Sequence, residues 1–318
     1  MRKLLLVVFF STAFFLIAGS VQAQESQTVT TGDFTKPVVF PGGNCVYRWT
    51  NSNPFIGLAA AGGTGNIGSF KAINTLPIPV VATFTAEPMA SDFAYVPISS
   101  TNSVSVISTA THSVVASIPV GDSPFGVAVN PQGTFVYVAN SNVNATGNTV
   151  SVISTATNKV VAAVFVGEGP RGIVVGADGS RVYVANSTSD NVSVINAANN
   201  EVIATIPTGQ TPVGVVISPD GSKLYVANTN GGSVSVIALS DNSVIATIPV
   251  EKFSNFLAVS PDGKTLYVTN GAGTTVTVIN AATNTIKKTI EVGSNPWGIA
   301  ISFDGSKAYV TLTTGATA

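Results

Sequence analysis

The chain has 318 residues, of which 45% are hydrophobic and only 9% charged, with 30 glycines, one cysteine and one histidine. The charged fraction lies far below the ~25% of an average soluble domain, which excludes coiled coils, charged disordered tails and a helix-rich enzyme. A net charge of −1 leaves no basic field for nucleic acid or an anionic membrane, and the single cysteine and single histidine exclude an intramolecular disulfide and a multi-histidine metal site.

The N-terminus has the pattern of a secretory signal peptide over residues 1–23. A basic start at residues 2–3 precedes an apolar run over 4–18, and residues 21–23 form a small-x-small cleavage site. A membrane anchor is the alternative, but about 15 apolar residues fall short of the ~20 that a spanning helix needs. Ser20 stands where a bacterial lipobox has its cysteine, which argues against a lipid anchor. We therefore expect export to the periplasm, the cell surface or the medium, with no membrane span after cleavage.

Residues 24–87 lack the repeat that organises the rest of the chain and indicate a small separate β module. They contain Cys45 and Trp49 in a strand-like stretch, a segment rich in glycine and alanine over 57–68, and an alternating strand over 80–86. The run that starts at Trp49 resembles PKD-like, immunoglobulin-type modules of bacterial surface proteins. This resemblance implies a β-sandwich that serves as a spacer or adhesion unit, with Trp49 in its core. We expect Cys45 to be a buried thiol.

A strand motif recurs along residues 88–318. Its tyrosines are spaced by 42, 46, 42, 42 and 42 residues, and the longer interval holds an insertion around Asn142 to Gly147 that we expect to be a loop. A fixed period of about 40–45 residues, with four short strands in each unit, is typical of β-propeller blades. The tyrosines of the motif are Tyr95, Tyr137, Tyr183, Tyr225, Tyr267 and Tyr309.

One unit shows why each repeat is expected to form four strands. Residues 214–218 are nearly all apolar, as in an inner strand buried on both faces. Residues 219–222 (Pro-Asp-Gly-Ser) form a turn, and the second and third strands come next, the third with polar and apolar residues in alternation. Residues 244–250 form the outer strand, where Pro249 suits an edge because its missing N–H costs no ladder bond.

These motifs resemble those of the YVTN-type β-propellers, which are related to seven-bladed lactonase-like and amine-dehydrogenase-like propellers. The resemblance covers residues 91–318 and rests on the Tyr-Val-x-Asn strands, the Ser-Pro-Asp-Gly-type turns and the Ile-Pro-Val-Gly strand ends. It implies an all-β fold, a propeller of four-stranded blades behind a small β-sandwich-like module. Seven blades are usual in the family, but residues 88–318 hold only about five and a half units of 42. A five-bladed ring with one surplus strand and an open array with two exposed sheet edges are both possible, and we favour the open array.

The titratable residues form no catalytic constellation. His112 occupies a turn position that is asparagine in the other repeats, and both residues tolerate the left-handed backbone that such turns need. The recurrent aspartates lie in Asp-Gly turns and set turn geometry, so no pair of carboxylates suits a glycosidase. We therefore expect no catalytic residue, no metal and no cofactor. The repeated residues are Asn158, Asn200, Asn242 and Asn284 in one turn, and Asp178, Asp220, Asp262 and Asp304 in the other.

The positions that vary between repeats lie in the loops that enter the inner strands. In a ring these positions face one axis, so their side chains would converge on a pocket for a glycan, a peptide or a small polar ligand. Ordinary loop variation, with the aromatic rings packed between blades, is the alternative. The candidates are Phe125, Arg171, Val213, Asn255 and Trp297 at the x position of the Pro-x-Gly motif, and Asp122, Glu168 and Lys252 three residues before the x position. One copy breaks the motif, with Ser254-Asn255-Phe256 in place of Pro-x-Gly.

We therefore expect a secreted or surface-exposed binding protein of bacterial type that is not an enzyme. Its propeller would serve as a docking platform for a protein, a glycan or a small polar ligand. A lactonase-like or dehydrogenase-like enzyme is the first alternative, but it needs a metal or a quinone, and the chain is poor in histidine and paired carboxylates. Binding of single-stranded nucleic acid by aromatic stacking is the second alternative, and the acidic net charge argues against it.

Overall fold

A computed structural model describes residues 3–10, 27–35, 47–51, 62–64, 70–73, 80–88, 93–109, 112–141 and 148–313. The chain divides into two compact units, Met1–Asp92 and Phe93–Ala318, and each is described by itself. Cys45 and the predicted insertion loop lie outside the described residues. Among the residues that are described, no helix is both long enough and apolar enough to cross a membrane.

The described strands of the N-terminal unit form one five-stranded sheet. They are β1 (Lys3–Phe10), β2 (Gln27–Thr30), β3 (Tyr47–Asn51), β4 (Gly62–Thr64) and β5 (Val80–Pro88). In the order β2-β1-β5-β3-β4, only β1 and β5 are parallel neighbours. The first strand of this sheet thus lies in the segment predicted to be a signal peptide, and the described part of the unit holds one sheet rather than the two of a sandwich.

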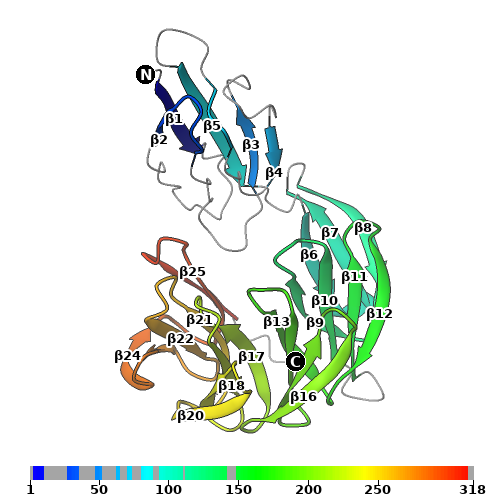
Figure 1. Cartoon of the computed structure of the whole chain (residues 1–318). Helices are drawn as coiled ribbons and strands as arrows, with labels where there is room; N and C mark the ends of the chain where they lie inside the picture. The colour runs from blue at the N-terminus through cyan, green and yellow to red at the C-terminus, as the bar shows by residue number, and fades with distance from the viewer. Residues whose placement is uncertain are drawn as a thin grey trace. The chain divides into compact units, whose positions relative to one another are not determined.

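The second unit is a β-propeller whose repeats form successive antiparallel sheets, numbered here as blades 1 to 6 (Figure 1). Blade 1 has three strands, blades 2 to 5 have four each, and blade 6 has two. In every four-stranded blade the strands pair in chain order from the inner to the outer strand. This arrangement confirms the all-β fold and the four-stranded unit predicted from the repeat.

The strand bounds follow the sequence motifs closely. Blade 1 comprises β6 (Phe93–Ile98), the 3-10 helix η2 (Ser99–Thr101), β7 (Ser103–Ser108) and β8 (Ser113–Pro119). Blade 2 comprises β9 (Pro124–Val129), β10 (Phe135–Ser141), β11 (Asn148–Ser154) and β12 (Lys159–Phe165), and blade 3 comprises β13 (Pro170–Val175), β14 (Arg181–Asn186), β15 (Asn191–Asn196) and β16 (Glu201–Pro207). Blade 4 comprises β17 (Pro212–Ile217), β18 (Lys223–Asn228), β19 (Ser233–Ala238) and β20 (Ser243–Pro249), and blade 5 comprises β21 (Ser254–Val259), β22 (Thr265–Asn270), β23 (Thr275–Asn280) and β24 (Thr285–Glu291). Blade 6 comprises β25 (Pro296–Ile301) and β26 (Ala308–Leu312).

The hydrophobic core of the propeller lies between neighbouring blades. Buried clusters join blades 1 and 2, 2 and 3, 3 and 4, and 4 and 5. Between blades 4 and 5, for example, Tyr225 and Val236 share a cluster with Leu266 and Ile279. Because successive side chains of a strand point to opposite faces, a central blade buries one apolar face against each neighbour. The second strands of the central blades are therefore buried along most of their length.

The asparagine that ends the Tyr-Val-x-Asn motif ties the second strand to the third. In blade 4, Asn228 is fully buried, and its Nδ2 donates to Ser233 Oγ at 3.0 Å and to Ser235 Oγ at 2.9 Å. Asn270 makes the same pair of bonds to the hydroxyls of Thr275 and Thr277 in blade 5. A buried amide must be paired to offset the cost of removing it from water. This requirement explains why Ser and Thr recur in the third strands.

The turn between the third and outer strands has the left-handed backbone predicted from its residues. His112 has a φ of 52°, and its asparagine counterparts have φ values between 52° and 61°. The N–H of His112 donates to the carbonyl of Ser108 at 2.8 Å, and that of Asn158 donates to the carbonyl of Ser154 at the same distance. The prediction that His112 is a turn residue is therefore confirmed.

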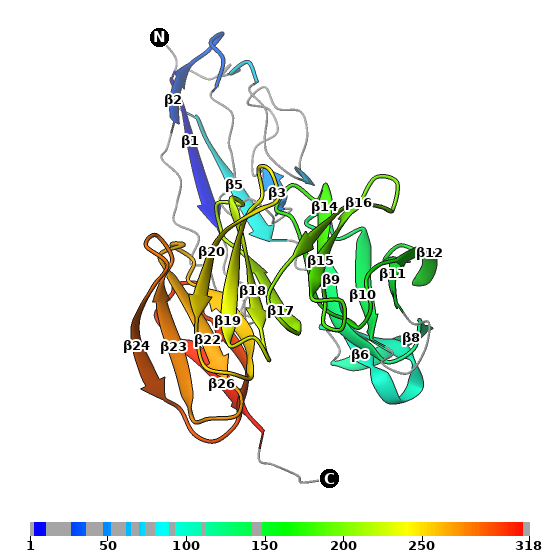
Figure 2. The same ribbon diagram turned by 90° about the horizontal axis from the view of Figure 1, so that it is seen from below.

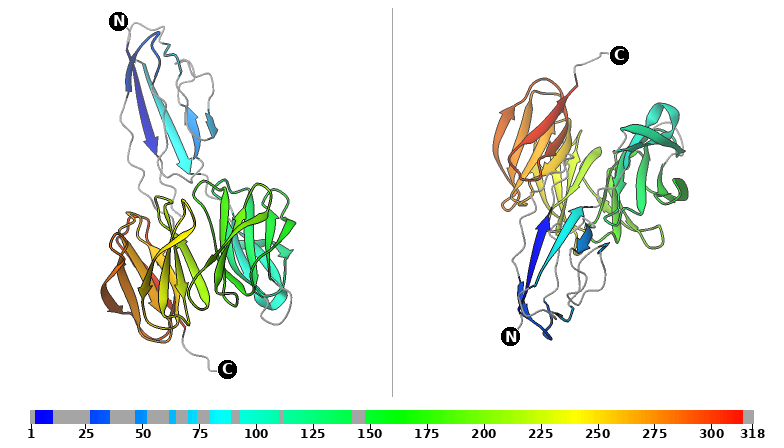
Figure 3. Two further views of the ribbon diagram at one scale, coloured as in Figure 1. Left: turned by 60° about the horizontal axis from the view of Figure 1, so that its bottom comes forward. Right: turned by 90° about the horizontal axis from the view of Figure 1, so that it is seen from above.

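The described strands of the propeller form an open array. Blade 1 and blade 6 are separate sheets, and no pairing joins β26 to β6 among the described strands. Figures 2 and 3 show the blades side by side in chain order, from blade 1 in cyan to blade 6 in red. Pro97 lies on β6, the edge strand of blade 1, where a residue without an N–H is tolerated. Of the two arrangements considered from the sequence, the described strands adopt the open one.

The Ser-x-Asp turns between inner and second strands hold charged carboxylates. In blade 6, Asp304 accepts hydrogen bonds from Ser302 Oγ at 2.6 Å and from Ser306 N at 3.0 Å, and these bonds lower its pKa from 3.8 to about 2. In blade 4, the hydroxyl of Ser218 and the N–H of Ser222 lower the pKa of Asp220 in the same way. Both carboxyls therefore bind a proton less tightly in the folded protein than in the unfolded chain.

We expect the free energy of unfolding to fall as the pH drops from about 4 to about 2. A carboxyl whose folded pKa lies below its unfolded pKa stabilises the fold above the unfolded value, and this contribution is lost as the pH falls through the folded value. Urea unfolding of the wild type and of Asp220→Asn, measured between about pH 2 and about pH 6, tests the expectation. The variant should lose less stability over the acid range, and equal losses would contradict the role of the turn carboxylate.

Candidate functional site

The loops that lead into the inner strands share one backbone feature. In blades 2 to 6 the residue before the inner strand has a positive φ, between 50° and 64°. This conformation turns the chain sharply, and in four of the five blades a proline then fixes φ at the first strand position. The entry to each inner strand is therefore fixed by the backbone. The residues with positive φ are Ser123, Gly169, Thr211, Phe253 and Asn295.

The glycine of the Pro-x-Gly motif allows neighbouring inner strands to approach closely. A Cβ atom on Gly172 would collide with the carbonyl oxygen of Val213 in the next blade, and a Cβ atom on Gly126 would collide with that of Arg171. A side chain could rotate away from such a contact, but a backbone carbonyl cannot move without separating the strands. The glycine of the Pro-x-Gly motif is thus required by the close approach of successive inner strands around the centre of the propeller.

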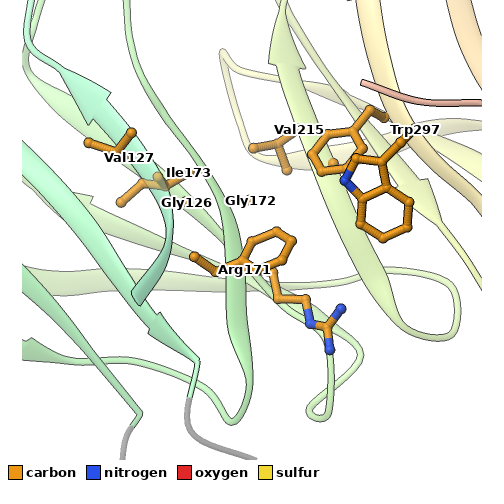
Figure 4. A pocket seen from close by; sticks show the side chains of 10 residues that line it. Gly126, Val127, Arg171, Gly172, Ile173, Val215 and Trp297 are labelled. Atoms are coloured by element: carbon orange, nitrogen blue, oxygen red, sulfur yellow. The ribbon is translucent and has the colours of Figure 1, made fainter. Parts of the chain in front are cut away.

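A cavity of about 430 Å³ lies along these inner strands (Figure 4). Its volume falls within the ~300–1,000 Å³ that is typical of small-molecule sites. Figure 4 shows the side chains of Arg171 and Trp297 reaching the cavity from different strands. Apart from one guanidinium group, the wall consists of aromatic rings, aliphatic side chains and glycine backbone. The lining residues are Phe125, Gly126, Val127, Arg171, Gly172, Ile173, Gly214, Val215, Phe256 and Trp297.

Three aromatic rings and the guanidinium group form a connected series along the wall. The Arg171 Cζ atom lies 5.3 Å from the centroid of the Phe125 ring, within reach of a cation–π interaction. The rings of Phe125 and Phe256 are nearly parallel, at 10°, with centroids 6.5 Å apart. The Phe256 and Trp297 rings meet edge to face, at 61° and 5.5 Å. The wall therefore offers both flat apolar surfaces and a positive charge.

The positive charge of Arg171 has no anionic partner among the described residues. Its Nε atom is buried and finds no hydrogen-bond acceptor there. The ion pair that the described residues form joins Lys264 and Asp262, in a distant turn. A buried N–H group without an acceptor is costly, and a cation near apolar walls adds to that cost. Arg171 thus places on the cavity wall a positive charge that no acidic side chain of the described residues neutralises.

Three of the eight residues singled out from the sequence line the cavity, namely Phe125, Arg171 and Trp297. In the last of these side chains, 37% of the surface is exposed. Val213 and Asn255 occupy the same motif position but are buried, at 2% and 7% exposed, and do not line the cavity. The x position of the motif therefore faces the cavity in three blades and not in the other two.

The three predicted charged residues lie in the entry loops and outside the cavity wall. The Oδ1 atom of Asp122 accepts a hydrogen bond from Asn102 Nδ2 at 2.8 Å, which joins the loop of blade 2 to blade 1. The N–H of Glu168 donates to Ser189 Oγ at 2.8 Å within blade 3. Lys252 is exposed. Asp122 and Glu168 thus make hydrogen bonds that hold the entry loops, and Lys252 faces solvent.

Phe256 lines the cavity although it was not among the residues predicted from the sequence. It stands where the other blades have the glycine of Pro-x-Gly, so blade 5 places a ring where they have no side chain. Thr269 accompanies this change, in place of the alanine of blades 2 to 4. Its hydroxyl donates to the carbonyl of Trp297 at 2.8 Å and accepts a hydrogen bond from the N–H of Phe256 at 3.2 Å. The break in the motif was the signal that could have identified Phe256.

The wall offers binding groups rather than groups for acid–base chemistry. It contains no histidine, cysteine, aspartate or glutamate. Within the described part of the chain, no group of three or more such residues could hold a metal ion. General acid–base catalysis needs a titratable side chain within hydrogen-bonding reach of the reacting atoms. The side-chain groups that the wall does offer are one guanidinium group, three aromatic rings and three aliphatic side chains.

Comparisons with known proteins support a β-propeller. Residues 89–203 match the family described as lactonase, 7-bladed β-propeller. No curated protein matches the sequence. The structure is similar to that of Kuenenia stuttgartiensis hydrazine synthase, with 26% identity and a TM-score of 0.62, over 69% of this chain and 70% of that chain. It is also similar to a functionally unknown protein from Desulfotomaculum acetoxidans DSM 771, with 20% identity and a TM-score of 0.63, over 70% of this chain and 73% of that chain.

Proposed function

We propose that the propeller is a binding module that takes a small ligand in the cavity of its inner strands and does not turn it over. The observation that carries the proposal is Arg171, a cation beside the Phe125 ring on the cavity wall that has no acidic partner among the described residues. A bound anion would neutralise this guanidinium group by accepting hydrogen bonds from its terminal nitrogens. The aromatic rings of Phe256 and Trp297 supply further contact area.

A melting screen against a library of small metabolites tests this proposal. A ligand at about 100 times its Kd stabilises by about 2.7 kcal/mol, which corresponds to a rise in Tm of about 5–10 °C for a domain of this size. We expect compounds that raise the Tm of the wild type to have little effect on Arg171→Ala. Lys252→Ala is the matched control, because it removes a positive charge from an entry loop outside the cavity. Compounds that stabilise the wild type and Arg171→Ala equally would contradict a site in this cavity.

A lactonase-like enzyme is the second candidate, because residues 89–203 match the lactonase propeller family. Lactone hydrolysis needs a nucleophile or an activated water together with a proton donor. The cavity wall has no residue that titrates near neutral pH, and this composition favours binding over hydrolysis. Proton release during incubation with a simple aldonolactone distinguishes the two candidates. Release that exceeds the spontaneous rate and is lost in Arg171→Ala would favour the enzyme.

The proposal extends to location: the first 23 residues direct export, and the propeller works outside the cytoplasm behind a PKD-like module. The apolar run and the small-x-small site support export, and the YVTN-like motifs are in keeping with a bacterial surface protein. Cleavage would remove β1 from the five-stranded sheet of the first unit. The intact mass of the protein purified from its native host decides the matter, because export predicts a chain that begins at Gln24.

A further inference from the structure

The cavity wall carries a single positive charge, and this charge determines which ligand charge the site can neutralise. Arg171 is the single basic residue of the lining, and the lining contains no acidic residue. A ligand with one negative charge would neutralise the site. A phosphate monoester carries about −1.5 to −2 at neutral pH and would leave excess negative charge against apolar walls. The charge balance therefore favours a monoanion over a dianion.

The geometry of the arginine favours a carboxylate as that monoanion. The buried Nε–H of Arg171 has no acceptor among the described residues. Because that atom is buried, a ligand would bind the two terminal nitrogens, whose parallel N–H groups match the two oxygens of a carboxylate. A neutral acceptor would satisfy the hydrogen bond but not the charge.

The remainder of the wall favours a flat apolar body on the ligand. Phe125 and Phe256 are nearly parallel, and Trp297 lies edge-on to Phe256 with 37% of its surface exposed. Val127, Ile173 and Val215 complete the wall and offer no hydrogen-bonding side chain. The hydroxyl groups of a sugar would find partners only on the inner-strand backbone, the Trp297 indole N–H and Arg171, whereas an aromatic ring would gain contact with most of the side chains.

We infer that the cavity takes a small aromatic monocarboxylate, with the carboxylate on Arg171 and the ring against Phe256 and Trp297. This inference rests on the proposed binding function and specifies its ligand class. It makes two demands that a general binding site does not make: the ligand must be singly charged, and its body must be flat and apolar.

Calorimetric titration of the full chain with four matched probes tests the inference. The probes are 2-naphthoate, the neutral 2-naphthamide, the non-aromatic cyclohexanecarboxylate and the dianionic 2-naphthyl phosphate. We expect 2-naphthoate to bind about 10- to 100-fold more tightly than the amide, as a hydrogen bond to a charged group implies. We also expect it to bind more tightly than the other two probes. Equal or tighter binding of the amide, the phosphate or the non-aromatic acid would overturn the ligand class.

Two variants test whether the carboxylate of the ligand binds at Arg171. In Arg171→Gln the affinity for 2-naphthoate should fall about 10- to 100-fold while that for the amide stays within about two-fold. Lys252→Gln, with the same loss of charge outside the cavity, should leave both affinities unchanged. If Arg171→Gln does not fold, as judged by its melting curve, Trp297→Leu replaces it and should weaken 2-naphthoate more than cyclohexanecarboxylate. If the metabolite screen yields Arg171-dependent ligands and none of the acids binds, the ligand class is wrong and the binding function stands.

Discussion

Replacing Gly172 by alanine is expected to lower the free energy of unfolding by about 2–4 kcal/mol. The new Cβ atom would collide with the carbonyl oxygen of Val213, which belongs to the inner strand of the next blade. Relief of this contact requires blades 3 and 4 to move apart, and that movement opens the buried cluster that joins Tyr183 to Leu224. The loss thus combines steric strain with reduced burial. Urea unfolding followed by circular dichroism measures it.

Gly298→Ala is the matched control for this substitution. Gly298 holds the same motif position in blade 6, where the nearest atom to a new Cβ is Thr311 Oγ1 at 3.0 Å. That atom belongs to a side chain on the exposed strand β26, so relief of the contact costs at most its exposed hydrogen bond from Gly298 N, at 2.8 Å, and moves no blade. We expect a loss of less than about 1 kcal/mol, as at ordinary surface positions. Equal losses in the two variants would show that glycine is needed for its own backbone and not for the approach of the next blade.

The fold was largely predictable because the same four-strand sequence pattern recurs several times along the chain. The Tyr-Val-x-Asn strand, the Asp-Gly turn and the edge proline each have a local physical reason, and their repetition fixes the order of strands in every blade. His112 is one example, since its counterparts in other repeats identified it as a turn residue with positive φ. Whether the first and last blades pair is not a property of the repeat, so closure of the array had to come from the structure.

The candidate site was predictable only in part, and the reason lies in the inner strands. The x position of Pro-x-Gly selects Phe125, Arg171 and Trp297, which line the cavity, but it also selects two residues that do not, Val213 and Asn255. In these inner strands the pairing shifts register after the first residue, as between Ser254 and Leu257. A bulge of this kind breaks the alternation of side chains. Strict period-two alternation therefore could not place Phe256 in the cavity.

Burial of a repeated tyrosine depends on the strands and blades that surround it. Tyr225 in blade 4 is 1% exposed and packs in the cluster shared with blade 5, whereas Tyr309, its counterpart in blade 6, is 58% exposed. Both residues sit at the same position of the second strand and pair with the same position of the inner strand, Val216 and Ala300 respectively. Tyr225 also pairs with Val236 of a third strand and has blade 5 beside it, whereas among the described residues Tyr309 has neither a third strand nor a following blade beside it.

Tyr225→Ala is expected to lower the free energy of unfolding by about 3–5 kcal/mol, the usual cost of removing a large buried aromatic side chain. Tyr309→Ala should cost less than about 1 kcal/mol, because little apolar surface is uncovered at an exposed site. Urea unfolding of both variants gives the difference directly. A loss in Tyr309→Ala close to that of Tyr225→Ala would mean that blade 6 is covered in solution, by a second copy or by another part of the chain. In that case the melting midpoint of the wild type should rise with protein concentration only if the cover is a second copy, since association stabilises the folded state by mass action.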